Sequence, residues 1–237
     1  MRTPIPALLA ILLASPTPYP QQGKPAQQEK PAAPAAPSIA VSNVRPYNIG
    51  HRVAPIVLPD LDGKRRDVFS ETEGKAIALV FWSMRDPISR HYVPFLKELA
   101  SAKADKLAIY LVNSNQDEIV GGAGDPLDVI RRYVAEENVT LPILIDRDNH
   151  LADDYGATAN VQVFLLDANR IVRYDGGIDD DPRGERKAKN QTVTPAFANA
   201  LEIVLRGDKP EQAWSQPNGR PIKRAPKAKP ANAGGGQ

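Results

Sequence analysis

The amino-acid sequence predicts an α/β fold in which a mixed central sheet is covered by helices on both faces. Residues 76–82 (AIALVFW) and 107–113 (LAIYLVN) are apolar throughout, which is typical of strands buried on both sides. Segments with helical periodicity alternate with strand-like segments along the chain. A two-stranded hairpin and a helix come last, so the sheet is expected to contain antiparallel as well as parallel neighbours.

The folded part begins with a predicted hairpin, because residues 53–63 (VAPIVLPDLDG) end on Asp62-Gly63, a dipeptide that favours tight turns. The first buried strand follows. Residues 87–103 are then expected to form a helix with one apolar face, in which Pro94 would introduce a kink. The second buried strand comes after this helix.

A second helix is expected from Asp125 to Asn138, because Asp is a favoured N-cap residue and Pro126 suits the first helical position. The remaining expected elements are a strand at 143–146, a short helix at 151–155, a hairpin of strands at 161–166 and 170–174, and a helix at 196–206 that ends at Gly207.

Both ends of the chain differ in composition from the middle. Residues 1–20 have a positive start followed by the apolar stretch ALLAILLA, which predicts a signal peptide and a periplasmic or extracellular protein. That stretch is too short to cross a membrane. Residues 21–48 are rich in Pro and Ala, and residues 209–237 form a basic tail rich in Pro, Ala and Gly, so both are expected to be disordered. The folded domain is expected at 49–208.

Charge and composition exclude several functions. Lys and Arg number 30 against 28 Asp and Glu, so the net charge of +2 gives no strong field to attract nucleic acid. The absence of Cys excludes disulfides, thiolate metal ligands and thiol catalysis. The three His residues lack metal-ligand spacing, and the segment from Asp146 lacks the Gly and Glu of a calcium loop. We therefore expect neither a metal nor a cofactor.

Five segments follow one another along the chain: APIVLPDLDGK, ALVFWSMRDPISRHYVP, LPILIDRDNHLADDYGA, VFLLDANRIVRYDGGIDDD and NGRPIKR. In this order they resemble the redoxin family, the peroxiredoxin-like branch that includes alkyl hydroperoxide reductase and thiol-specific antioxidant proteins. The resemblance implies a thioredoxin-like fold with an inserted strand. It also implies a thiol oxidoreductase or peroxidase activity.

Every position that would carry redox chemistry in that family is changed in this chain. The nucleophilic Cys of the family stands just before the Pro that opens the first helix, and Asp86 occupies that position before Pro87. The other changed positions are Ser89 for a second Cys, Asn160-Val161 for a Thr-Pro pair with its Pro in cis, and Arg220 for a Cys of the tail motif. Val161 disfavours a cis bond, which costs about 2.5 to 4 kcal/mol without Pro.

Asp86 has two interpretations. A carboxylate at this position caps a helix by accepting a backbone N–H, and we favour this role over that of a catalytic carboxylate. If the tail folds back as the resemblance implies, Asp86 and Arg220 would meet and form an ion pair where two cysteines pair in relatives. The alternative, which we favour, leaves Arg220 as a solvated tail residue.

The favoured function is an exported redoxin-like domain without catalytic cysteines, which binds an unidentified protein or peptide on the surface where relatives bind substrate. That surface is expected to include Trp82, Met84, Arg85, Pro87 and Asn160. One alternative is a remaining oxidoreductase or antioxidant activity, as the family resemblance implies. Another is an envelope structural or spacer protein that is anchored by its tails.

Overall fold

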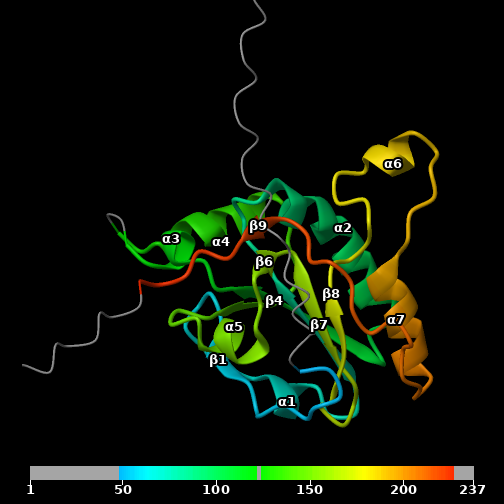
Figure 1. Cartoon of the computed structure of the whole chain (residues 1–237). Helices are drawn as coiled ribbons and strands as arrows, with labels where there is room; N and C mark the ends of the chain where they lie inside the picture. Colours follow the sequence, from blue (N-terminus) through cyan, green and yellow to red (C-terminus); the bar gives the residue numbers. More distant parts are fainter. Residues whose placement is uncertain (1–47, 122–123, 227–237) are drawn as a thin grey trace, which may run out of the picture. The chain divides into compact units, whose positions relative to one another are not determined.

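A five-stranded sheet in the order β5-β4-β3-β7-β8 lies at the centre of the computed structural model, which describes residues 48–121 and 124–226 (Figure 1). Strands β3, β4 and β5 are parallel, whereas β7 is antiparallel to β3 and β8 is antiparallel to β7. The strands are β3 (Ala76–Phe81), β4 (Leu107–Asn113), β5 (Ile143–Ile145), β7 (Gln162–Leu166) and β8 (Val172–Gly176). The predicted mixed sheet is thereby confirmed.

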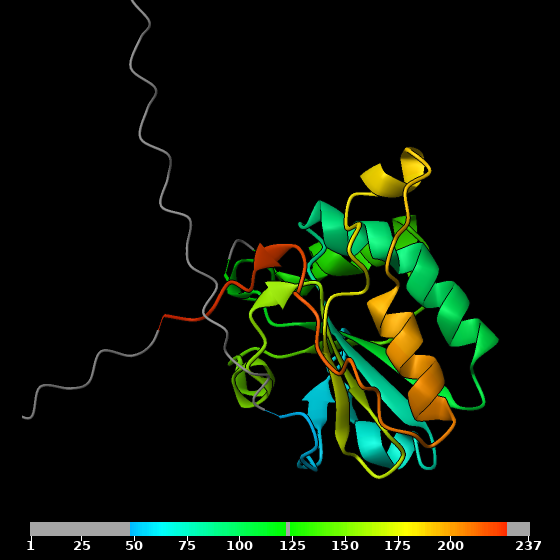
Figure 2. The same ribbon diagram turned by 45° about the vertical axis from the view of Figure 1, so that its right-hand side comes forward.

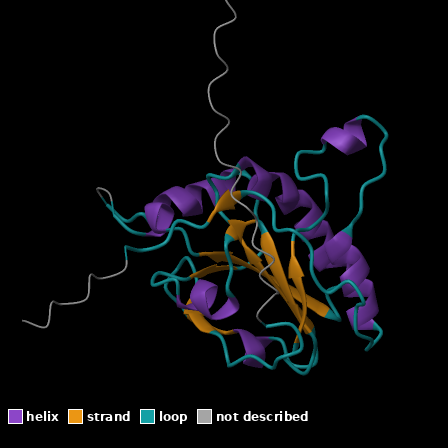
Figure 3. Ribbon diagram, viewed as in Figure 1, coloured by secondary structure: helices purple, strands orange, loops and turns teal. Residues whose placement is uncertain are grey.

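Helices cover both faces of this sheet, as expected (Figure 3). The six residues of β3 are all buried because their side chains alternate between two apolar clusters. One cluster is shared with α2 (Pro87–Ala102), α4 (Leu127–Glu136) and α7 (Ala196–Leu205). The other is shared with α1 (Val68–Glu71) and α5 (His150–Tyr155).

The structure also contains several short elements. An antiparallel hairpin of β1 (Val57–Pro59) and β2 (Arg65–Asp67) forms the expected turn around Gly63. The sequence reading did not include α1, α3 (Gln116–Ile119), α6 (Glu185–Ala188), β6 (Ala159–Asn160) or β9 (Arg220–Pro221). Elements of two to four residues are too short to show a hydrophobic period, which explains the omission.

The C-terminal segment differs most from expectation, because the structure continues through the stretch that was read as a disordered tail. Residues 213–225, which we call the strap, run from β8 across the domain, past β6, to α5 (Figure 2). The strap pairs with β8 through Trp214 and with β6 through β9, and Ile222 is buried among side chains of the second cluster. Residues 1–20 and 21–47, expected as signal peptide and linker, lie outside the described residues, as do residues 227–237.

Among residues 48–121 and 124–226, none of the helices combines the length and the apolar character that crossing a bilayer requires.

Candidate functional site

Asp86 stands at the N-terminal end of α2 and is only 1% exposed. Its Oδ1 atom accepts the N–H of Ile88 at 2.9 Å, with Pro87 at the first helical position, so the expected helix cap is present. Its Oδ2 atom accepts the main-chain N–H of Arg220 at 2.6 Å. One carboxylate therefore closes the helix and fastens the strap.

The contact between Asp86 and Arg220 is not the ion pair considered above. Within the described residues, no ion pair of the Arg220 guanidinium is found, and the side chain is exposed. The Arg220 backbone pairs with Asn160 through β9 and β6, so this residue is not part of a solvated tail either. The two positions meet, and the main chain supplies the donor.

Gly219 explains how the strap comes so close. It has a positive φ of +86°, and a Cβ atom added there would lie 1.4 Å from the Asn160 carbonyl oxygen and 2.6 Å from Asp86 Oδ2. No other residue fits between these two oxygens, because any side chain begins with that atom. Glycine here lets the backbone of the strap lie directly against the Asp86 carboxylate.

Ser89 and Val161, the next two changed positions, are both fully buried. The Ser89 Oγ atom accepts the N–H of Ser83 at 3.2 Å, which ties the first turn of α2 to the loop before it. Val161 packs in the larger core cluster, and its carbonyl accepts the N–H of Asn218 at 3.0 Å. The described residues contain no cis peptide bond, so the bond before Val161 is trans.

Asn160 and Asn115 form a reciprocal pair of amide hydrogen bonds. The Nδ2 group of Asn160 donates to Oδ1 of Asn115 at 3.0 Å, and the reverse bond measures 3.2 Å. The same two side chains hold the strap, because Asn160 Nδ2 also donates to the Arg220 carbonyl and Asn115 Oδ1 accepts the N–H of Lys223. Asn115 was not among the residues expected from the sequence.

Glu118 was also missed, although it fixes the loop that precedes α2. Its buried carboxylate accepts hydrogen bonds from the Ser83 hydroxyl, from the main-chain N–H groups of Met84 (3.1 Å) and Arg85 (3.2 Å), and from Asn113 Nδ2 (2.8 Å). The available signal was the polar run NSNQDE directly after a buried strand. Because β3 and β4 are parallel, the residues that follow them meet at one edge of the sheet.

Most of the expected partner surface is covered. Trp82, Met84 and Asn160 are buried, and the ring centroids of Trp82 and Tyr133 lie 5.8 Å apart, so these three side chains do not contribute to the exposed surface of this structure. Trp82 directly follows β3 and belongs to the larger core cluster, and Asn160 lies beneath the strap. Arg85 and Pro87 are exposed, as expected.

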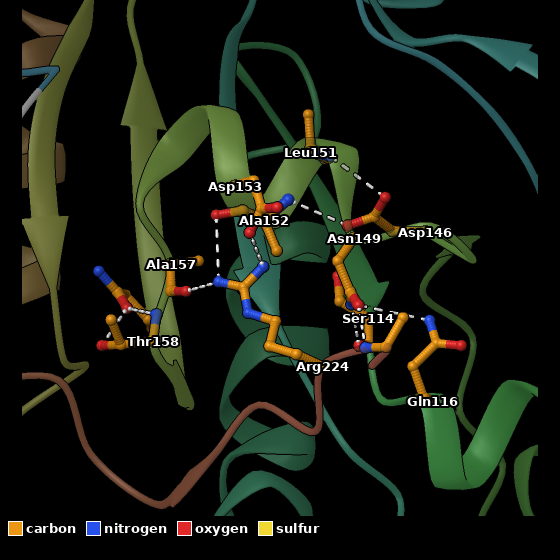
Figure 4. Close-up of polar contacts among 12 residues, drawn as sticks. Ser114, Gln116, Asp146, Asn149, Leu151, Ala152, Asp153, Ala157, Thr158 and Arg224 are labelled. Atoms are coloured by element: carbon orange, nitrogen blue, oxygen red, sulfur yellow. Dashed lines mark hydrogen bonds and ion pairs between the residues drawn. The ribbon is translucent and has the colours of Figure 1, made fainter. Parts of the chain in front are cut away.

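The far end of the strap is held at α5 (Figure 4). The Arg224 guanidinium donates to Asp153 Oδ1 at 2.5 Å and to the main-chain carbonyls of Ala152 and Ala157. A cation is favourable there, because the last carbonyls of a helix carry a partial negative charge. In addition, the Asn149 Oδ1 atom accepts the N–H of Ala225 at 2.8 Å.

Asp146, which begins the calcium-like segment, caps α5 instead of facing an open cation site (Figure 4). Its two oxygens accept the N–H groups of Leu151 (3.2 Å) and Ala152 (3.0 Å) and the Ser114 hydroxyl (2.7 Å). In the part of the chain that the structure describes, no group of three or more His, Asp or Glu side chains is arranged to hold a metal ion.

Asp175 is a residue of β8 that lies beside the beginning of the strap: its main-chain N–H donates to the Ala213 carbonyl, and its carbonyl accepts the N–H of Ser215. Burial raises the pKa of its carboxyl group to about 6, and a 2.6 Å hydrogen bond from Gln162 Nε2 opposes this rise only in part. This carboxylate is ionised at neutral pH, and its ionisation destabilises the folded state.

The model of the AhpC/TSA family matches residues 49–175, which is more than half of the chain. A thiol-disulfide oxidoreductase named ResA from Halalkalibacterium halodurans is 29% identical over 134 residues, covering 55% of this chain and 70% of the relative. The thioredoxin-like protein YneN of Bacillus subtilis is 26% identical over 124 residues, covering 52% and 68%.

Two solved structures resemble the fold at a TM-score of 0.63. A hypothetical protein from Sinorhizobium meliloti is 27% identical, with 75% of this chain and 94% of that chain covered. An uncharacterized conserved protein from Geobacillus kaustophilus is 23% identical, with 76% and 94% covered. The matched residues include the sheet, α2 and Asp86, so the chain belongs to the AhpC/TSA family and has its thioredoxin-like fold, but it contains no cysteine.

Proposed function

We propose that this protein is an exported, non-catalytic redoxin-fold module that binds an extended segment of polypeptide. The observation that carries the proposal is the state of Asp86, which stands where the family has its nucleophile. Both of its oxygens accept main-chain N–H groups, and the strap covers it. A carboxylate cannot form the sulfenic acid or the disulfide through which thiol enzymes react.

The way the strap is bound supports a binding role. We call the residues that hold it the strap site: Asp86, Asn115, Asn149, Thr158 to Val161 and the C-terminal end of α5. This site binds an extended segment largely through the main-chain groups of that segment, and some of these bonds are backbone–backbone bonds along β6. Peptide-binding proteins use such bonds when they add a strand to their own. A surface that already binds one extended segment is suited to bind another.

An activity assay tests the non-catalytic part of the proposal. The full chain is incubated with a dithiol and a protein disulfide, and separately with a hydroperoxide, and turnover is measured against buffer. We expect no turnover, with the Asp86→Ala variant giving the same result. The names of the relatives suggest the alternative of thiol-disulfide exchange, and turnover that is lost in Asp86→Ala would establish that Asp86 is catalytic and refute the proposal.

Export is supported by the composition of residues 1–20. The test is cell fractionation of the full chain and of a variant that lacks these residues. The full chain is expected outside the cytoplasm with a shortened N-terminus, and the variant inside it. Equal cytoplasmic retention of both would contradict export.

A further inference from the structure

We infer that the strap is a resident ligand of the strap site, and that the site accepts in trans a partner segment with the pattern Gly-x-Pro-aliphatic-x-Arg once the strap has left. This inference rests on the proposed function, because it specifies the segment that the module binds. The pattern is that of residues 219–224 of the chain itself.

The first support is that the bonds to the strap fall mostly on its main chain. The bonded groups are the N–H of Asn218, the N–H and carbonyl of Arg220, the N–H of Ile222, the N–H and carbonyl of Lys223 and the N–H of Ala225. Any extended segment offers the same groups, so these contacts bind polypeptide without fixing its sequence.

Three side-chain positions of the strap supply the selectivity. At Gly219 there is no room for a Cβ atom. At Ile222 the side chain is buried in the apolar cluster beside α5. At Arg224 the guanidinium meets two carbonyl oxygens and the carboxylate of Asp153.

Pro221 occupies a place where the strap needs no donor. The N–H of Arg220 donates to Asp86, and the N–H of Ile222 donates to the Thr158 carbonyl at 3.0 Å. The residue between them points its nitrogen away from β6, since donors alternate along an edge strand. Proline is tolerated at such a position and lowers the cost of ordering the segment.

The strap also has the features of a segment that can leave. Ile222 is its only buried side chain. The other members of the two large apolar clusters belong to the rest of the domain. The connection from α7 to the strap runs through Glu211 and Gln212, which are exposed. Opening of the strap would thus leave nearly all of the core packed.

The first test uses the full chain with a protease recognition sequence inserted between Glu211 and Gln212. A fluorescent peptide of residues 213–226 is the probe, and its binding is followed by anisotropy. We expect little binding to the uncut chain, because the tethered strap competes at an effective concentration of about millimolar. After cutting, the labelled peptide should exchange with the strap and bind.

Peptide variants test the pattern. Arg224→Ala and Gly219→Ala are each expected to weaken binding at least tenfold. Gln216→Ala is the matched control, since the Gln216 side chain is exposed and has no hydrogen bond among the described residues. Equal affinity of all four peptides would overturn the pattern.

Hydrogen exchange of the intact chain tests the opening without any cut. The amides of Arg220, Ile222, Lys223 and Ala225 are expected to exchange together, at least 100-fold faster than those of Leu79 and Val80 in β3. Exchange of both sets at one rate would show that the strap opens only when the domain unfolds, and would overturn the inference. Turnover in the activity assay would refute the proposed function, whereas the exchange rates test only the opening of the strap. The two failures are therefore distinguishable.

Discussion

The main-chain N–H of Arg220 donates a 2.6 Å hydrogen bond to Oδ2 of Asp86, the buried carboxylate that caps α2. Asp86 thus joins two segments that are 134 residues apart in the sequence. A charge-assisted bond to a buried carboxylate is stronger than one between neutral groups. Loss of this side chain should therefore weaken the helix and the strap together.

Replacing Asp86 by Ala is expected to lower the free energy of unfolding by about 1 to 3 kcal/mol, because the N-cap and the bond to Arg220 both disappear. Asp86→Ser is the informative comparison. Serine caps helices well, but it has a single oxygen on a shorter side chain. It should therefore recover the capping contribution to stability and leave the Arg220 amide open to exchange. Denaturant unfolding gives the free energy, and hydrogen exchange gives the protection of that amide. Equal protection in all three chains would contradict the role assigned to Oδ2.

Replacing Gly219 by Ala is expected to detach the strap, since the new Cβ atom would overlap the Asn160 carbonyl. Gly74→Ala is the matched control. Gly74 has a similar φ of +75°, but a Cβ atom added there meets nothing within 4 Å, so this change costs only about 1 to 2 kcal/mol of backbone strain. The measurement is hydrogen exchange at Arg220 and Ile222, which should become fast in Gly219→Ala and stay slow in the control. A strap protected equally in both variants would argue against the close approach.

Replacing Glu118 by Ala is expected to destabilise the domain by about 2 to 5 kcal/mol, because several buried donors lose their shared acceptor. Glu98→Ala serves as a control on the exposed face of α2 and should change stability by less than about 0.5 kcal/mol. Denaturant unfolding at neutral pH measures both. Similar effects of the two substitutions would mean that the loop before α2 does not depend on Glu118.

Asp175 gives the domain a defined dependence on pH. Its folded-state pKa of about 6 lies above the ordinary value of 3.8, so its contribution to stability is complete below pH 3.8 and is lost as the pH rises through 6. Asp175→Asn removes this loss and should be more stable than the natural chain at pH 7, by about 1 to 3 kcal/mol. The gap should close as the pH falls to about 4. Unfolding of both chains at several pH values checks this, and a gap independent of pH would show that burial does not govern this carboxyl.

Replacing Asp86 by Cys creates the single thiol of an otherwise cysteine-free chain. The strap covers this position, so alkylation of the new thiol is expected to be at least tenfold slower than in unfolded protein. Adding Gly219→Ala should free the strap and bring the alkylation rate close to that of unfolded protein. Labelling followed by mass spectrometry gives both rates, and fast alkylation of the single variant would show that the position is open.

The sheet and its main helices were predictable because each is long enough to show its period. The apolar run of β3 and the Asp-Pro start of α2 are examples, and Asp86 was recognised as a cap for the same local reason. The strap was not predicted, because its sequence is rich in polar and basic residues, contains two Pro residues and has one buried residue, Ile222. Glu118 and Asn115 were not predicted as site residues, because their partners come from distant segments that only the assembled sheet brings together.

The chain has two tryptophans, and they lie in different layers of the molecule. Trp82 is completely buried beside Tyr133, whereas Trp214, in the strap, is 40% exposed. Their intrinsic emission therefore reports on separate events. A soluble quencher such as acrylamide reaches Trp214 in the native protein, whereas a red shift of the Trp82 emission requires water to enter the interior. Fluorescence measurements on one sample therefore distinguish a loosened strap from an unfolded domain.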